Sequence, residues 1–582
     1  MTRHTKPDGR LSTSYSVACE PSAYSASVLN GLVEDVPFDR SHHPVPTPPR
    51  RRALLFGSAH PGWRWAVAAR SAIAFGLPAL IVLAVGHQQQ AMIVALGAFA
   101  VLYGEGRAYR MRWRVVLLAG AGFLTAAAIG AVVGSHDLGQ GIIIVAALSV
   151  VALVASYVMV AGRAGPPGMF FFVLACAVAM RMASAGVSVP VIVGYTALGV
   201  LSSVLVSMSP LLRDAHAPEK TAAAAGLRAV DAYLECLERA QPSAAERHVA
   251  GAAMHTAWAT VHDAGLPARA PDSGIVQTML TAHRRFIGAA DDESALDIPV
   301  PMTRPTIAER LRRSLTIRSH AATTALRTLA AAGIAGGLSV LLDLGRPDWA
   351  VITAVLVLNL GPDRIVGTVR ALHRVGGTVI GLAVFAVMHA LSPSGVVLVL
   401  VLMALMFLTD LFVARNYGIA VIFITPLALL ISGSLGGPIV VPIRDRLIET
   451  LVGALVAVMA MWTIVPRAHR HDLRWNESRV LRVASNLLET LRTKPPTDST
   501  PLRLRRDLQF ELVGNHLSGV AAFRDEPAWT QERWPRHAEI GRIGYDLLAE
   551  CWMTPANQLL ADPDSWTRQI QRLTGSATSR QS

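Results

Sequence analysis

The stretch GIIIVAALSVVALVASYVMV, residues 141–160, decides the fold class because it holds twenty consecutive residues without a charge. An α-helix rises about 1.5 Å per residue, so this stretch is long enough to cross the roughly 30 Å of hydrocarbon in a bilayer. A core helix of a soluble protein would show a polar face with a period of about 3.6 residues, and this stretch shows none. It is therefore predicted to be a transmembrane helix.

Similar apolar runs lie on both sides of this stretch, in two sets of six. The runs are 66–85, 91–104, 115–134, 141–160, 168–186 and 189–208, followed by 326–342, 349–361, 375–391, 395–413, 417–432 and 449–465. Within 66–208 the only acidic residues are Glu105 and Asp137, both in expected loops. The sequence thus predicts an all-α polytopic membrane protein with about 12 transmembrane helices.

The segments outside the apolar runs differ in composition and suggest five regions. We expect a disordered N-terminal tail over 1–60, a first transmembrane bundle over 61–210, a helical insert over 211–325, a second bundle over 326–466 and a polar helical tail over 467–582. In the insert, His248, His255 and His262 repeat every seven residues. Consecutive members of this series would lie about 10 Å apart on a helix, so we expect a packed or solvated face and no metal site.

Composition excludes several classes of protein. The chain has 582 residues, of which 52% are hydrophobic and 16% charged. Soluble domains carry about 25% charged residues, so a soluble multidomain enzyme is excluded, as is a wholly disordered chain. The net charge of +13 comes from basic residues that flank apolar runs, which argues against nucleic acid as a partner. With no Walker A loop and no HExxH motif in the sequence, we expect neither enzymatic activity nor a cofactor.

The positions of arginine predict the orientation in the membrane. Loops 105–114, 161–167, 362–374 and 414–416 carry arginine, as do the segments that flank the insert. Arginine near span ends marks the cytoplasmic side, so both termini and the insert are expected in the cytoplasm of a multi-pass plasma-membrane protein. Two places do not fit this arginine pattern, Arg181 and the group Arg444-Asp445-Arg446. The group lies either on an outer loop or within the start of the last span.

The two sets of runs share sequence anchors. Arg70 and Gly76 recur as Arg327 and Gly333, Arg114 and Gly120 recur as Arg370 and Gly376, and the other anchors keep offsets of 252–259 residues. Six spans in each half predict a parallel 6+6 repeat. The second and eighth runs are short and end in Gly104-Glu105-Gly106 and Gly361-Pro362-Asp363. Short, interrupted segments at matching places in two repeats are typical of a transport site.

Several stretches of the second half resemble a known family. They are RPDWAVITA at 346–354, RALHRVGGTVIG at 370–381, RNYGIAV at 415–421, TPLALL at 425–430 and RLIETLVG at 446–453. They are similar to the fusaric acid resistance, or aromatic acid exporter, family, of which the plant aluminium-activated malate transporters are distant relatives. The resemblance implies a 6+6 bundle with cytoplasmic helices, organic anions as substrates, commonly aromatic carboxylates, and a homodimer as one open arrangement. The first half departs from this pattern.

Basic side chains are the main candidates for the anion path. Arg370, His373 and Arg374 share one helix face, and Arg107, Arg110 and Arg114 do the same in the first half. A guanidinium binds a carboxylate through a fork of donors, so two converging faces would gather anions. The alternative is that these arginines set topology or bind lipid phosphates. The expected substrate-binding set also includes Arg364, Trp349, Asn359 and Tyr417, although Trp349 and Tyr417 could instead be interfacial anchors.

One acidic residue lies inside or near the end of an apolar run. Asp410 in the stretch FLTDLFVA is a candidate for proton coupling, with Arg415 or His389 nearby, since carboxylates in membranes are costly and usually face a cavity or a partner. The alternative is a structural pair with Arg415. We expect a permease that exports organic anions on a proton or voltage gradient. Two rivals remain: a passive anion channel, which would not need Asp410, and a membrane scaffold that recruits partners through its cytoplasmic helices.

Overall fold

The computed structural model describes residues 64–136, 141–239, 244–288, 300–302, 304–316, 319–359, 363–432 and 438–578. All regular elements in these ranges are helices. The expected N-terminal tail over 1–60 lies outside the described residues, as do Asp137, Gly361 and Pro362.

Every predicted apolar run coincides with a helical segment. In the first half these are α2 Trp65–Ala84, a broken segment over Gln90–Leu102 with α3 Val94–Ala98 at its centre, α4 Tyr109–Ser135, α5 Gly141–Ala161, α6 Phe170–Ser184 and α7 Val189–Met208. In the second half they are α13 His320–Leu341, α14 Pro347–Leu358, α15 Arg364–Leu391, α16 Gly395–Phe412, α17 Tyr417–Ile431 and α18 Val440–Thr463. Of the helices in the described ranges, eight are long and apolar enough to span a membrane.

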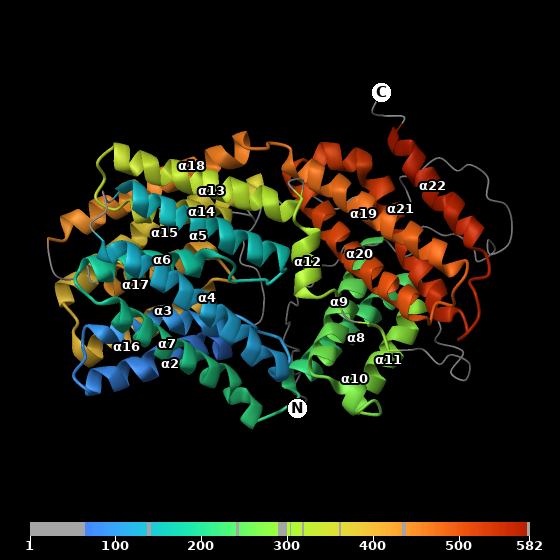
Figure 1. Ribbon diagram of the computed structural model, residues 1–582, viewed down its shortest axis with the longest axis horizontal. Helices are drawn as coiled ribbons and strands as arrows, with labels where there is room; N and C mark the ends of the chain where they lie inside the picture. Colours follow the sequence, from blue (N-terminus) through green and yellow to red (C-terminus); the bar gives the residue numbers. More distant parts are fainter. Residues whose placement is uncertain are drawn as a thin grey trace, which may run out of the picture.

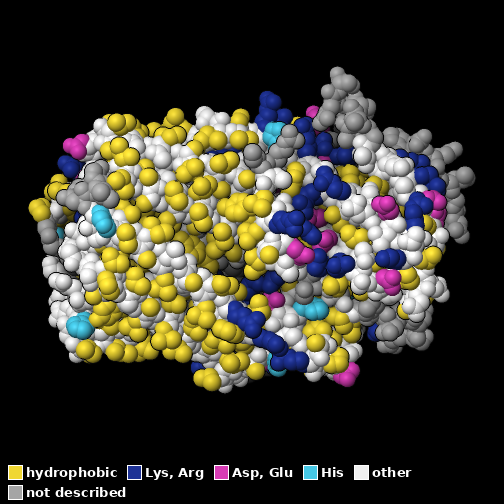
Figure 2. All heavy atoms as spheres, in the orientation of Figure 1, with side chains coloured by type: hydrophobic (Ala, Val, Ile, Leu, Met, Phe, Trp, Pro, Cys, Tyr) yellow, Lys and Arg dark blue, Asp and Glu magenta, His cyan; other side chains and the backbone are white. Residues whose placement is uncertain are grey.

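The four shorter apolar helices form the interior of this bundle. They are Gln90–Leu102, Phe170–Ser184, Pro347–Leu358 and Tyr417–Ile431, the second and fifth segments of each half. Every residue of α3 is buried, and so is every residue of α14 from Asp348 to Leu358. The longer helices surround them and expose apolar side chains, among them Leu118 and Leu455. Figure 2 shows hydrophobic side chains spread over the surface of the bundle. Such a surface matches a hydrocarbon solvent.

The two halves use the same kinds of helix pairs. Helix α4 packs on α6, and α15 packs on α17; α3 packs on α7, and α14 packs on α18. Between the halves, α2 packs on α16 and α13 packs on α5, so the first helix of each half contacts the fourth helix of the other. The membrane bundle is therefore one interlocked unit (Figure 1).

The insert and the C-terminal tail form one polar helical region at one end of the bundle (Figures 1 and 2). The insert contributes α8 Ala217–Arg239, α9 Ala244–Asp263, α10 Leu266–Arg269, α11 Gly274–Ile287 and α12 Ile307–Arg313, and the tail contributes α19 Ala468–Leu491, α20 Ser499–Asp525, α21 Pro527–Met553 and α22 Pro563–Thr578. Helix α9 packs on α20 and α21. His248 stacks on His516 in this contact, with 4.8 Å between ring centroids, so the histidine face of α9 is a packed one.

One of the two open readings of residues 444–446 is wrong. These residues do not form an outer loop, because α18 begins at Val440 and runs through them. Asp445 and Arg446 are buried there. The last membrane helix thus starts nine residues earlier than the apolar run at 449 suggested, and it carries charged side chains into the bundle.

Candidate functional site

Arg374 is a fully buried cation in the membrane bundle. It lies on α15, ten residues beyond Arg364, which corresponds to about 15 Å along the helix or roughly half the thickness of a bilayer core. The side chain has no solvent exposure, and its guanidinium forms no well-aligned hydrogen bond within the described part of the chain. The neighbouring polar group is the hydroxyl of Tyr417, at the start of α17. Arg374 thus keeps unused donors in the interior of the bundle.

Arg446 is a second buried cation in the same half. Its guanidinium carbon lies 3.6 Å from the ring centroid of Trp349, which is itself buried on α14. Its Nε and Nη1 atoms lack acceptors among the residues with described positions. Arg374 and Arg446 are close enough to repel each other electrostatically. We call Arg374, Arg446, Trp349 and Tyr417 the guanidinium cluster.

The acidic groups near this cluster already have other partners. Asp348 binds Arg346, with 3.0 Å between Oδ2 and Nη2, and Glu449 Oε1 accepts the backbone N–H of Arg346 at 2.7 Å. Asp445 pairs with the exposed side chain of Arg444 at 2.9 Å. No ion pair joins Arg374 or Arg446 to a carboxylate in the described ranges. An unpaired cation in hydrocarbon costs several kcal/mol, about 2.5–3.5 by insertion scales, and a bound anion would offset that cost.

Arg370 and His373 lie beside this cluster on α15, four residues and one residue before Arg374, respectively. The guanidinium of Arg370 lies 4.8 Å from the centroid of the Tyr417 ring. His373 is half-buried and packs next to Gly418 of α17. The structure therefore brings together five of the predicted site residues, namely Arg370, His373, Arg374, Tyr417 and Trp349, on α14, α15 and α17.

Two other residues of the predicted site, Asn359 and Arg364, form contacts with distant segments of the chain. Asn359 Oδ1 accepts the backbone N–H of Met169 at 2.9 Å, and its Nδ2 donates to the carbonyl of Pro167 at 2.8 Å. Arg364 forms ion pairs with Asp525 and Glu526, at 3.7 and 2.9 Å. Their polar groups are engaged by the protein itself.

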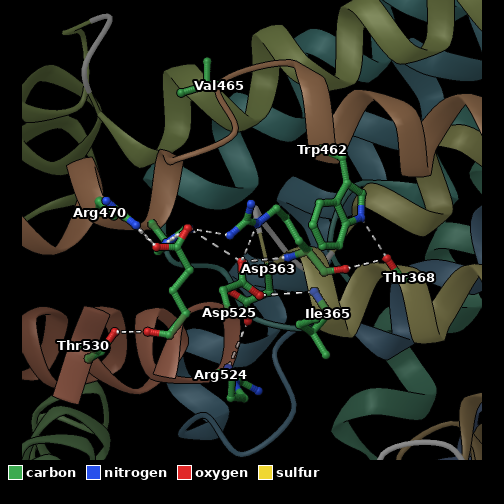
Figure 3. A network of polar contacts seen from close by, with 12 residues as sticks. Asp363, Ile365, Thr368, Trp462, Val465, Arg470, Arg524, Asp525 and Thr530 are labelled. Atoms are coloured by element: carbon green, nitrogen blue, oxygen red, sulfur yellow. Dashed lines mark hydrogen bonds and ion pairs between the residues drawn. The ribbon is translucent and has the colours of Figure 1, made fainter. Parts of the chain in front are cut away.

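A polar junction joins the membrane bundle to the polar region, and Figure 3 shows Asp525 and Arg470 in it. Arg364 belongs to this junction through its ion pairs with Asp525 and Glu526. Asp525 accepts the backbone N–H groups of Arg364 and Ile365 at 2.9 and 3.1 Å, so it caps α15 at the helix start, where a carboxylate is stabilising. Arg470 binds Glu526 on the same side. Burial by itself would raise the pKa of Glu526, but hydrogen bonds from Arg470 and Arg364 hold this pKa below its ordinary value. The junction fixes the N-terminal end of α15, on which Arg374 lies.

The first-half arginines do not converge on the guanidinium cluster. Arg107 pairs with Asp263 of the insert at 3.6 Å, and Arg110 is exposed. Arg114 is also exposed and lies over its neighbour Trp113, 5.3 Å from the ring centroid. Two facing arginine surfaces remain a prediction, with Arg107 directed to the insert and Arg114 to Trp113 in the structure.

Asp410 is buried where α16 packs on α2. It lies beside the hydroxyl of Ser71, and Arg64 and Glu105 are the charged groups that act on it. This position is at the contact between the two halves and not in the guanidinium cluster.

Sequence reasoning missed Arg446 as a site residue. It stood out only as an exception to the arginine pattern and as the first residue of the stretch RLIETLVG. The sequence signal that could have identified Arg446 was its position just before an apolar run. Interpreting that position required knowing that α18 begins at Val440, so that Arg446 lies inside the helix.

Comparisons with known proteins agree with this picture. Residues 334–460 match the family described as fusaric acid resistance protein-like, which confirms the resemblance predicted from the sequence. The chain is 23% identical over 564 residues to the uncharacterized membrane protein YvaC of Bacillus subtilis, covering 83% of this chain and 85% of that protein. It is 27% identical over 240 residues to the uncharacterized protein YhfK of Escherichia coli, covering 40% of this chain but only 33% of that protein. No solved structure matches.

Proposed function

On the premise that this is a membrane protein with a fusaric acid resistance protein-like domain at 334–460, we propose that it exports small organic anions, with aromatic carboxylates as the expected substrates. The carrying observation is the pair of buried guanidinium groups of Arg374 and Arg446, which form no ion pair with a carboxylate in the described ranges. Arg374 lies beside the hydroxyl of Tyr417, and Arg446 lies over the ring of Trp349. A guanidinium fork matches a carboxylate, and the neighbouring rings match an apolar substrate body.

We further infer that the two halves are a parallel 6+6 repeat. The support is the recurrence of the same helix pairs in both halves and the placement of short helices second and fifth in each. In this arrangement the polar region and both termini are on the cytoplasmic side, where the arginine pattern puts them. Anions would then enter from the side of Arg370 and Arg374.

The membrane potential is a sufficient energy source for a monovalent anion. Moving one charge through 100 mV provides about 2.3 kcal/mol, which concentrates the anion outward roughly fiftyfold in an inside-negative cell. Proton coupling would require a titrating carboxyl group, and Asp410 is the candidate. A passive channel remains the second candidate function, favoured because Asp410 lies outside the guanidinium cluster.

Uptake of radiolabelled benzoate into inside-out membrane vesicles tests the proposal. Arg374→Ala and Arg446→Ala are expected to lower the uptake rate at least about tenfold, the effect of losing a charge-assisted hydrogen bond to the substrate. Arg374→Lys keeps the charge but not the fork and is expected to retain part of the rate. Equal rates for wild type and Arg374→Ala would refute the anion role.

Two controls separate the alternatives. Arg114→Ala removes an exposed arginine from the first half and is expected to leave uptake unchanged. Asp410→Asn abolishes a proton-driven component but leaves a channel current intact. The scaffold hypothesis predicts instead that deletion of 216–300 abolishes function while Arg370→Ala and Arg374→Ala are silent.

A further inference from the structure

The polar region contains a cavity that the transport proposal does not use. It lies between the insert helices α9 and α11 and the tail helices α20 and α21, with about 50 Å³ open to the centre of a water molecule. One water needs about 10–15 Å³ measured in this way, so the cavity is several times larger. Its walls include the rings of Trp258, Phe286 and Trp552 and the side chain of Met254.

A buried cation lines this aromatic cavity. Arg505 is 3% exposed, and its guanidinium carbon lies 3.7 Å from the centroid of the Trp552 ring. Its Nη1 donates to the carbonyl of Pro496 at 3.0 Å, whereas its Nε and Nη2 have no acceptor within the described ranges. Burial lowers the pKa of Arg505 to about 10, so the side chain remains charged near neutral pH. No carboxylate forms an ion pair with Arg505 in the part of the chain that the structure describes.

Two further donors on the cavity wall are unused. Trp258 Nε1 is buried without an acceptor, and neither ring nitrogen of His283 has a hydrogen-bond partner, again counting only described residues. Burial and the charge of Arg505 lower the pKa of His283 to about 3, so this ring is neutral and carries one N–H donor. The other arginine on the wall, Arg506, is already bound to Asp507, with 2.7 Å between Nη2 and Oδ1.

Buried polar groups in proteins are normally paired, so several unused donors around one cavity call for an acceptor. The acceptor must be anionic to offset the charge of Arg505, and its body must be flat and apolar to lie between the rings. We propose that this cavity is a binding site for a small aromatic carboxylate. Arg505 holds the carboxylate, Trp258 and His283 supply the additional hydrogen bonds, and Phe286 and Trp552 contact the ring.

This inference does not rest on the proposed transport, because the cavity is lined by residues of α9, α11, α20 and α21, whereas Arg374 lies on α15. In Figure 1 those four helices lie in the polar region and α15 lies in the membrane bundle. The test is equilibrium dialysis of radiolabelled benzoate against the purified full-length protein in detergent. In an Arg374→Ala background, saturable binding is expected to persist with one site. Adding Arg505→Ala to that background is expected to weaken binding at least about tenfold.

Matched variants keep the result interpretable. Arg503→Ala removes an exposed arginine from the same helix and is expected to leave benzoate binding unchanged. Trp258→Phe keeps an aromatic wall but removes one donor, and a several-fold loss of affinity is expected even if Arg505→Ala fails to fold. Cyclohexanecarboxylate and inorganic phosphate, used as competitors, are expected to displace benzoate weakly.

Three outcomes would overturn the proposal. They are unchanged binding in a folded Arg505→Ala protein, unchanged binding in Trp258→Phe, and displacement by phosphate as effective as by unlabelled benzoate. A failure of the transport proposal looks different, because it leaves benzoate binding of Arg374→Ala equal to that of wild type while the Arg505→Ala effect remains.

Discussion

The two membrane halves place their helices alike but fill the space between them differently. Gly199 of α7 packs on the carbonyl of Val94, and Gly453 of α18 packs on the carbonyl of Ala350. Seven residues before these glycines lie Ile192 in the first half and the charged Arg446 in the second. The same backbone contact thus carries an aliphatic side chain in one half and a cation in the other.

Arg374, the other buried arginine of the cluster, also has an apolar residue at the corresponding place in the first half. Gly122 of α4 packs on Phe172, and Gly377 of α15 packs on Val421. The anchor that pairs Arg114 with Arg370 places Leu118 at the position that Arg374 has in the second half. In the first half, Phe123 and Phe172 stack with 4.6 Å between ring centroids, so aromatic rings close the interior there.

The comparison indicates whether the buried arginines are required for the packing of the helices. At these corresponding positions the first half carries apolar side chains, and its own buried arginine, Arg112, lies near the start of α4 instead. Buried unpaired charges reduce stability, so the scaffold gains nothing from Arg374 and Arg446. Their presence in one half only is the reason for assigning the anion site to that half.

The largest expected effect comes from moving a charge into the apolar half. Ile192→Arg buries a guanidinium in a fully packed place, at a cost of at least about 3 kcal/mol, and the yield of folded protein in detergent should collapse. The reverse change, Arg446→Met, is expected to raise the melting temperature while benzoate uptake falls. A folded Ile192→Arg protein with the melting temperature of wild type would show that the first half also holds a polar cavity.

Glu477 tests whether pairing distinguishes structural charges from functional ones. It is as buried as Arg374 but binds Arg533 and Arg536 at 2.6 and 2.7 Å. Burial by itself would raise the pKa of Glu477, but the neighbouring ring of His537, with 3.6 Å between Nδ1 and Oε1, and the charge of Arg533 lower that pKa to about 2. This stabilisation is present above the unfolded pKa of about 4.3 and is lost as the pH falls from there toward 2.

We therefore expect Glu477→Gln to lower the free energy of unfolding by about 3 kcal/mol near neutral pH, and by progressively less below about pH 4. Thermal unfolding of the full-length protein across this pH range measures the difference. Glu489→Gln, at an exposed position of the same helix, is the control. A difference from wild type that stays constant with pH would contradict the pairing argument.

The glycine contacts test the equivalence of the two halves directly. A Cβ at Gly199 or at Gly453 would meet backbone atoms of the neighbouring short helix, so each change to alanine should cost about 1–3 kcal/mol. Gly333→Ala in α13, where nothing lies within 4 Å, should be neutral or slightly stabilising. Thermal melting compares the three variants. A large loss at only one of the two tight glycines would break the proposed equivalence.

The smallest effect is expected in the aromatic interior of the first half. Phe123→Leu removes one stacked pair and should cost about 1 kcal/mol in stability, with benzoate uptake unchanged. The vesicle assay and a melting curve measure both. A reduced uptake rate in a stable Phe123→Leu protein would place the first half on the transport route.

The fold class was predicted correctly from the sequence, because a long run of apolar residues indicates a helix that lies in the hydrocarbon of a bilayer. All apolar runs were found as helices, and the short second and eighth runs proved to be two of the four interior helices. The fifth run exceeded α6 by two residues at each end and the eleventh exceeded α17 by one, and neither was singled out as short. The start of α18 was missed because charged residues precede its apolar part.

The candidate site was predictable only in part. Spacing put Arg370 and Arg374 on one face, but it could not tell that Arg374 is fully buried while Arg114 and Arg110 are exposed. Helices that are apolar on nearly all sides carry no periodic mark of the face that packs. The contact of Arg364 with Asp525 and that of Asn359 with Met169 could not be predicted either, because each joins residues more than 150 positions apart in the sequence.

The sequence by itself determined that this chain is helical, that it lies in a membrane, which segments are apolar and which family its second half resembles. These properties follow from local composition, which sets the solvent that each segment prefers. Only the tertiary structure decided which cations lack a counter-charge, because pairing depends on the side chains that neighbouring helices bring within a few ångströms. It decided in the same way that insert and tail enclose Arg505 in an aromatic cavity.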